Sequence, residues 1–358
     1  MTTRTALSRA LLLLLSASAT RSVALGQQQR QAQPSLERLF YHTDTEDSYE
    51  SFVRHADRIS VVAPGAYRVD SLGIVWGEVD RRVLELAKAR GVKVMPLLVN
   101  EGFHQPSLRK LLADTAARAR ATRSMAELCR SQGYWGWQFD IENVSIQDRN
   151  RLTAWYTEAA DALHRAGCTI SIAVVHRPGE EAGALPYHRF LFDSWRAGYD
   201  LAALGRVGDF VTIMSYSQHT RRTPPGPQAG LPWMRDVADY FLRYVPPEKL
   251  SLGIATQSMH WFTREDNTLP ERARSWAEAI SHRWATGLAE RYGAKLQWDD
   301  RQGVTYGFYE NGGTFEWLFV EDARSFQLRL ALAREKRLRG ISVWVLGPED
   351  ERIWEALK

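Results

Sequence analysis

Apolar and polar residues alternate along the chain in two kinds of segment. Short apolar runs are followed by stretches in which apolar residues recur at helical spacing. Apolar runs with few polar interruptions are typical of strands whose two faces are both covered. The strand candidates are residues 38–43, 58–64, 92–100, 136–143, 169–175, 209–216, 250–256 and 340–347.

The segments between these strands carry helix signals. In VDRRVLELAKARG, Val83, Leu84, Leu86 and Ala87 recur at helical spacing, and Gly91 stands where a C-terminal cap belongs. Repeated strand–helix units with eight strand candidates predict a (β/α)8 TIM barrel, which is an α/β fold. A doubly wound sheet is the alternative, but no glycine-rich phosphate loop follows the first strand candidate.

The stretch between the seventh and eighth strand candidates departs from this repeat. Residues 296–322 resemble β-hairpin material around Asn311-Gly312-Gly313. We therefore expect a small insertion at about residues 263–325, carried by a barrel that spans residues 36–358, and no second domain.

The first 35 residues have a different composition. Arg4 and Arg9 precede the apolar run 10–15, and small residues follow as far as Gly26. This layout is typical of a secretory signal peptide over residues 1–26, and its apolar run is too short for a membrane span. The polar residues 27–35 then form a linker. We expect a secreted or periplasmic protein with no membrane insertion after signal removal; a buried N-terminal helix is the alternative.

Charge and cysteine content narrow the function classes. The 358 residues include 46 basic and 42 acidic ones, for a net charge of +4, and no long run of one sign. Nucleic acid is therefore not indicated as a partner. Cys129 and Cys168 can form one disulfide in an exported protein, although two cysteines are also what chance leaves in a chain of this length. We expect a monomer.

The fourth strand candidate, GWQFDIEN, carries the chemistry. Side chains alternate along a strand, so Gln138, Asp140 and Glu142 share one face. In a barrel this polar face points into the lumen and ends at the C-terminal mouth, where barrel active sites lie. Two carboxylates so placed raise each other's pKa, and Glu142, the outermost, is expected to serve as a general acid. A structural network of buried acids paired with basic residues is the alternative.

WGWQFDIE resembles the D-x-x-D-x-D-x-E motif on the fourth strand of family 18 glycoside hydrolases. Trp135, Gln138, Asp140 and Glu142 occupy its four marked positions, and the last two match. IMSYSQH on the sixth strand resembles the M-x-Y-D segment of the same family, with Met214 and Tyr216 in place and Ser217 where Asp is usual. GVKVMPLLVNEGF and GISVWVLGPEDERIW resemble the branch that includes spore-cortex and cell-wall lytic N-acetylglucosaminidases.

The resemblance implies a substrate-assisted retaining mechanism without an enzyme nucleophile, metal or cofactor. Glu142 would protonate the glycosidic oxygen. Asp140 would orient the 2-acetamido group of the substrate, which attacks the anomeric carbon, and Tyr216 would donate a hydrogen bond to that group. Gln138 would hold Asp140 by a hydrogen bond. The expected substrate-binding residues are Gln138, Met214, Trp344, Tyr41, Asn100 and Gln257.

Together these features predict an exported hydrolase of β-linked N-acetylglucosamine glycans, of the peptidoglycan or chitin type, whose partner is a polysaccharide or oligosaccharide. Because Gln138 and Ser217 replace acids, a catalytically weak or inactive glycan-binding protein on the same barrel is a second hypothesis. A barrel hydrolase for protein-linked sugars is a third.

Overall fold

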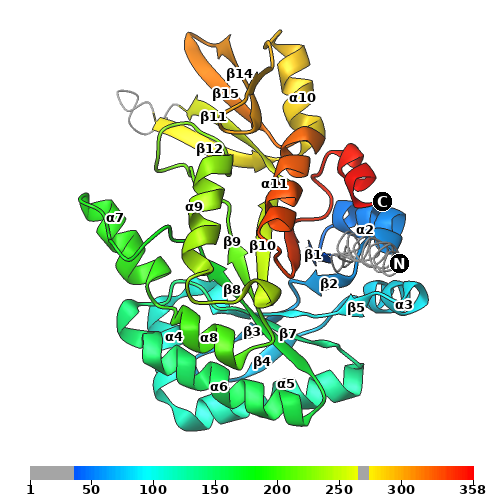
Figure 1. Cartoon of the computed structure of the whole chain (residues 1–358), viewed down its shortest axis with the longest axis vertical. Helices are drawn as coiled ribbons and strands as arrows, with labels where there is room; N and C mark the ends of the chain where they lie inside the picture. Colours follow the sequence, from blue (N-terminus) through cyan, green and yellow to red (C-terminus); the bar gives the residue numbers. More distant parts are fainter. Residues whose placement is uncertain (1–35, 265–273) are drawn as a thin grey trace, which may run out of the picture. The chain divides into compact units, whose positions relative to one another are not determined.

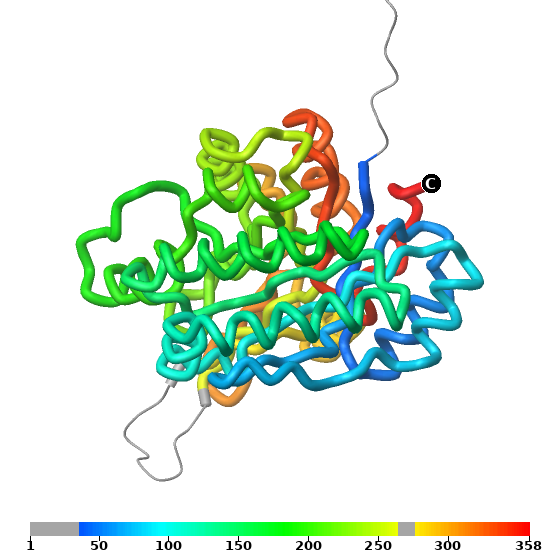
Figure 2. Tube along the Cα trace, turned by 90° about the horizontal axis from the view of Figure 1, so that it is seen from below, coloured from blue at the N-terminus to red at the C-terminus, as the bar shows by residue number. Residues whose placement is uncertain are grey.

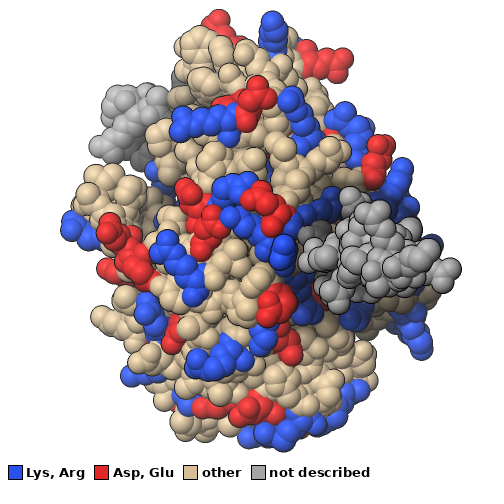
Figure 3. All heavy atoms as spheres, viewed as in Figure 1, with Lys and Arg blue, Asp and Glu red and all other residues tan. Residues whose placement is uncertain are grey.

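The computed structural model describes residues 36–264 and 274–358, and Leu36–Lys358 form one compact unit. The predicted signal peptide (1–26) and linker (27–35) lie outside the described residues. Within the described part, no helix is long and apolar enough to cross a membrane. Basic and acidic side chains are interspersed over the face that Figure 3 shows, as expected from the near balance of charge.

Eight parallel strands form a ring, and each corresponds to one of the strand candidates (Figure 1). The third strand is split into two segments. Its first segment pairs with β2 and its second with β7, so the ring closes through this strand. The (β/α)8 prediction is thereby confirmed. The strands are β1 (Glu37–His42), β2 (Val61–Pro64), β5 (Lys93–Val94) with β6 (Leu97–Asn100), β7 (Gly136–Asp140), β8 (Thr169–Val175), β9 (Phe210–Met214), β10 (Leu250–Ala255) and β16 (Gly340–Trp344).

Helices lie outside this ring, and α5 and α6 run side by side (Figure 2). Their ends follow local rules: the Asp80 carboxylate accepts a hydrogen bond from the Arg82 amide to begin α3, and Gly91 ends it at φ 67°. The helices are α2 (Glu46–His55), α3 (Arg81–Arg90), α4 (Gln105–Ala113), α5 (Thr115–Gln132), α6 (Arg149–Arg165), α7 (Pro186–Leu191), α8 (Leu201–Val207), α9 (Leu231–Phe241) and α11 (Ala323–Glu335).

Strand alternation divides the core in two. Trp137, Phe139 and Ile141 are fully buried in the layer between the strands and the helices. The lumen holds a second cluster, against which Trp135 and Trp344 pack. Its buried members are Leu39, Tyr41, Val61, Ala63, Met95, Leu97, Val99, Phe210 and Val345.

In the described residues, the insertion is a five-stranded antiparallel sheet with one helix, α10 (His282–Arg291). It begins at Ser258, a few residues before the expected 263. The expected hairpin is present: Asn311 pairs with Thr314 across Gly312 and Gly313, both at positive φ. The strands are β11 (Ser258–Arg264), β12 (Arg274–Ile280), β13 (Gln297–Asp299), β14 (Val304–Asn311) and β15 (Thr314–Val320).

One further hairpin, β3 (Tyr67–Val69) with β4 (Val75–Gly77), follows β2 and was not predicted. Strands of three residues are too short to show an alternating pattern. Cys129 near the end of α5 and Cys168 just before β8 form a disulfide, so the open question about these two residues is resolved in favour of a bridge.

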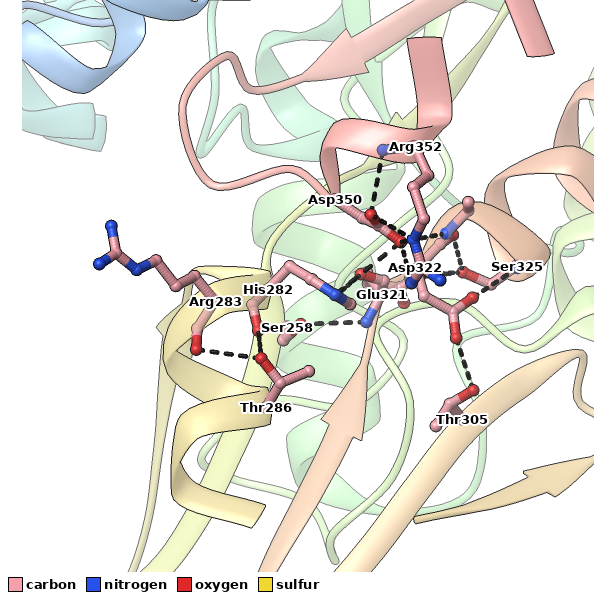
Figure 4. Close-up of polar contacts among 11 residues, drawn as sticks. Ser258, His282, Arg283, Thr286, Thr305, Glu321, Asp322, Ser325, Asp350 and Arg352 are labelled. Carbon is pink, nitrogen blue, oxygen red and sulfur yellow. Dashed lines mark hydrogen bonds and ion pairs between the residues drawn. The ribbon is translucent and has the colours of Figure 1, made fainter. Parts of the chain in front are cut away.

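A buried polar junction joins the insertion to the barrel where β15 ends (Figure 4). The Glu321 amide donates to Ser258 at the start of β11, and the Glu321 carbonyl accepts from His282 of α10. The Glu321 carboxylate pairs with Arg329 of α11, and both side chains are about 2 % exposed. Arg329 also donates to the carbonyl of Ala229. Glu321 therefore contacts both the insertion and the barrel helix α11.

The adjacent residue, Asp322, extends this junction and caps α11. Its carboxylate accepts from the Ser325 amide and from the Thr305 hydroxyl. Asp350, just before the C-terminal 3-10 helix η6 (Glu351–Leu357), accepts from the Ala323 amide. The start of α11 is therefore held from both sides.

We expect Glu321→Ala to lower the free energy of unfolding by about 3–5 kcal/mol, because Arg329 would keep a buried charge without its partner. Glu85→Ala is the matched control: it breaks the exposed pair with Arg81 and should cost less than about 1 kcal/mol. Urea denaturation followed by circular dichroism measures both. Equal losses in the two variants would contradict the role assigned to Glu321.

Candidate active site

A cavity of about 300 Å³ opens at the carboxyl ends of the barrel strands. Its wall combines carboxyl groups with aromatic and apolar side chains. The lining residues are Tyr41, Phe103, Asp140, Glu142, Ala173, Val175, His176, Met214, Tyr216, Ser217 and Trp344. Six of the nine site residues expected from the sequence line this cavity: Asp140, Glu142, Tyr216, Met214, Trp344 and Tyr41.

Asp140 is the last residue of β7, and Glu142 follows two residues later on the same face. Asp140 lies in register with Val99 of the lumen cluster, so the alternation predicted for this strand holds in the fold. Both side chains are partly buried and face the cavity. Among the described residues, neither carboxylate receives a hydrogen bond, which leaves both free to act on a bound molecule.

The backbone that carries Glu142 is held by three neighbours. The Asn100 side chain donates to the Glu142 carbonyl at 3.0 Å and accepts from the Glu142 amide at 2.9 Å. Tyr199 donates to the Ile141 carbonyl at 2.8 Å. Asn143 adopts φ 56° and donates to the Phe103 carbonyl. Asn100, expected to bind substrate, is buried away from the cavity and instead fixes the position of Glu142.

The two carboxyl groups differ in their protonation. Burial raises the pKa of Asp140 to about 6, and the charge of Arg68 opposes that rise. Burial, and then the negative charge of Asp140, raise the pKa of Glu142 to about 8. Because the groups interact, these values describe the pair as it loses two protons. At neutral pH Glu142 therefore keeps its proton while Asp140 is mostly ionised.

Arg68 is a charged neighbour that sequence reasoning missed. Arg68 pairs with Val99 on the neighbouring strand β6, and Val99 in turn pairs with Asp140 on β7. Tyr67 and Val69 on either side of it pack in the outer core, so Arg68 points to the lumen side. Its strand, β3, was not predicted, and the alternation Tyr67-Arg68-Val69 is the one signal that the sequence offers.

Gln138 lies directly below Asp140 and is fully buried. Its side-chain oxygen accepts a hydrogen bond from the Tyr41 hydroxyl at 2.7 Å. Its nitrogen donates to the hydroxyls of Ser171 (3.0 Å) and Thr212 (3.2 Å). The expected bond to Asp140 is thus replaced by bonds across the lumen, because a neutral amide supplies the donor and acceptor that three hydroxyl groups need. Trp135, at the first motif position, stacks on Phe210 and fills the lumen.

The other expected residues fall into two groups. Tyr216, Met214, Trp344 and Tyr41 line the cavity, and the ring of Trp344 lies 5.4 Å from that of Tyr41. Burial raises the pKa of Tyr216 well above its usual range, so its hydroxyl remains a hydrogen-bond donor. Gln257, between β10 and β11, does not line the cavity.

His176 also lines the cavity and was not singled out, although it follows β8 directly. Arg196 donates to its Nε2 at 3.1 Å, which leaves the proton on Nδ1, where the ring donates to the Met214 carbonyl. Burial, and then the Arg196 charge, lower the pKa of His176 to about 3. His176 is therefore neutral and positions β9. Within residues 36–264 and 274–358, no group of acidic, histidine or cysteine side chains is arranged to hold a metal ion.

Comparison with known proteins gives a consistent picture. Residues 47–349 match the family model "Glycosyl hydrolases family 18". The chain is 22 % identical over 324 residues to the uncharacterized glycosylase YvbX of Bacillus subtilis, with 89 % of each chain covered. It is 30 % identical over 278 residues to the cortical fragment-lytic enzyme of Bacillus subtilis, covering 76 % of this chain and 61 % of that enzyme. It therefore spans about three fifths of that enzyme's length.

Solved structures agree with this match. The crystal structure of a chitinase from Chromobacterium violaceum superposes with a TM-score of 0.79 at 25 % identity, covering 90 % of this chain and 98 % of that one. The agreement extends over nearly all of both chains, so it includes the barrel and the insertion.

We expect Asp140→Asn to lower the pKa of Glu142 below its value of about 8, because the neighbouring negative charge is removed while burial remains. Carbon-13 NMR of labelled glutamate carboxyl groups measures this pKa. Glu127→Gln, an exposed change on α5, is the control and should leave it in place. An unchanged pKa in Asp140→Asn would show that the two carboxyl groups do not interact.

Proposed function

Because this chain belongs to family 18 of the glycosyl hydrolases and is a glycosidase, we propose that it is exported and cleaves β-linked N-acetylglucosamine glycans of the peptidoglycan or chitin type with retention of configuration. The observation that carries this proposal is the pair at the end of β7. A protonated Glu142 and an ionised Asp140 share one cavity at the barrel mouth.

The proposed first step breaks the glycosidic bond. Glu142 gives its proton to the departing glycosidic oxygen while the acetamido oxygen of the same substrate sugar bonds to the anomeric carbon. Positive charge then develops on the acetamido group, and ionised Asp140 stabilises it. In the second step Glu142, now a carboxylate, takes a proton from water as the water attacks the anomeric carbon. The acetamido group is released and Glu142 is protonated again.

The remaining lining residues suit such a substrate. Tyr216 keeps its proton and can donate to the acetamido oxygen, and Trp344 offers a flat apolar face to a sugar ring. The buried network around Gln138 is neutral, so it adds no charge that would compete with Asp140 for a proton. Export is supported by the charged, apolar and small-residue order of residues 1–26.

The test compares wild-type protein with Glu142→Gln on chitin oligomers and on peptidoglycan glycan strands, with new reducing ends as the readout. We expect Glu142→Gln to lower kcat by roughly 10²–10⁴-fold, the usual contribution of a general acid. Glu127→Gln, on the outer helix α5, is the matched charge control. Equal rates for wild type and Glu142→Gln would refute the role of Glu142. Binding without any turnover by wild type would favour the glycan-binding alternative.

The pH dependence of kcat/KM gives an independent test. Activity requires ionised Asp140, so it should fall as the pH drops through about 6, where Asp140 gains a proton. Activity also requires protonated Glu142, so it should fall as the pH rises through about 8. The expected profile is a bell with its maximum between these values. An alkaline limb that begins below pH 6 would contradict the elevated pKa of Glu142.

A further inference from the structure

A second cavity of about 500 Å³ adjoins the active site. The two cavities share Glu142, Val175, His176 and Ser217 in their walls, so a molecule bound at Glu142 can extend from one into the other. The outer wall comes from the segments after β8 and β9, which include α7 at the left of Figure 1. We call this second cavity the arginine arm, after Arg196, Arg221 and Arg222 in its wall.

Among the described residues that line the arginine arm, Glu142 is the one acid, so the wall carries more positive than negative groups. Among the described residues, Arg196, Arg221 and Arg222 lack a carboxylate at ion-pair distance. Arg196 is the most buried of the three, and its guanidinium contacts the neutral ring of His176. A cation that is partly removed from water without an anionic partner is unfavourable, and a bound anion would offset that cost.

Glu180, which lies between β8 and α7, is already engaged by other groups. Glu180 accepts hydrogen bonds from the hydroxyls of Tyr240 and Tyr244, and it lies 3.8 Å from Arg177. The carboxylate of Glu180 is therefore bound by Tyr240, Tyr244 and Arg177. Within residues 36–264 and 274–358, Glu180 thus forms no ion pair with the three arginines of the arm.

Aromatic rings position this charge along the arm. The Arg221 guanidinium lies 5.3 Å from the ring centre of Trp276, and that of Arg222 lies 5.9 Å from the ring of Tyr187. Trp195, also in the wall, packs on Phe103 of the active-site cavity and so connects the two cavities. Flat rings suit sugar faces, and guanidinium groups form paired hydrogen bonds with carboxylates.

We propose that the arginine arm binds a carboxylate carried by the glycan beside the cleaved bond, which makes acidic strands the preferred substrate over neutral ones. This inference rests on the proposed function and specifies its substrate class. The fitting ligand alternates N-acetylglucosamine with a sugar that carries an acid, either on a lactyl ether or on a peptide attached to that ether.

The experiment measures binding in a Glu142→Gln background, so that cleavage does not interfere. Isothermal titration uses three tetrasaccharides: one with free lactyl carboxylates, one with these groups converted to neutral methylamides, and one with carboxylate-bearing peptides on the lactyl groups. We expect at least one acidic form to bind about tenfold tighter than the methylamide, as for one hydrogen bond between charged groups. The free-acid and peptide forms show which carboxylate is bound.

Arg221→Gln with Arg222→Gln, added to that background, should reduce the preference for the acidic form to less than about twofold. The matched control replaces Arg123 and Arg130 on α5 by Gln; both are exposed, and the same net charge is removed. The proposal would be overturned if Arg221→Gln with Arg222→Gln left the preference for the acidic form in place, or if the control pair also removed it. It would also be overturned if all three ligands bound equally or if none of them bound. Cleavage by wild type is scored separately, so failure of the proposed hydrolysis is distinguishable from failure of the arm.

Discussion

Two carboxyl groups on one face of a buried strand cannot both be ionised at low cost, and the mouth of this barrel is organised around that constraint. Asp140 and Glu142 share the cavity with few polar neighbours, so burial and mutual repulsion separate their protonation. The paired hydrogen bonds of Asn100 to the Glu142 backbone keep the second group beside the first. A protonated and an ionised carboxyl group thus exist side by side at one pH.

The hydrogen-bond network directly below this pair is neutral. Gln138 satisfies the hydroxyls of Tyr41, Ser171 and Thr212 across the barrel, and Trp135 packs against Phe210 further down. A buried polar network is stabilising only when its members are satisfied, and an amide meets that condition without carrying charge. The two departures from the family motif are therefore structural parts of this lumen, and the reactive charge is confined to its outer end.

The insertion and the loops around the mouth act on the same site from outside. Glu321 and Arg329 tie the insertion to α11, and Trp276 of the insertion contacts Arg221 of the arginine arm. The insertion thus contacts both the barrel helix α11 and the arginine arm. Positive charge in the loops beside the carboxyl pair is one way in which a common barrel can acquire its own substrate preference.

Strand periodicity was enough to predict the eight barrel strands, the inward face of Gln138, Asp140 and Glu142, and the hairpin at Gly312, because each depends on neighbours within a few residues. Other features required the folded chain. Arg68 lies on a strand of only three residues, and His176 and the arginines of the arm lie beyond the ends of strands. The partners of Asn100 and Gln138 lie on other segments of the chain. Hydrogen bonds and burial between distant segments are decided by packing, which local sequence does not encode.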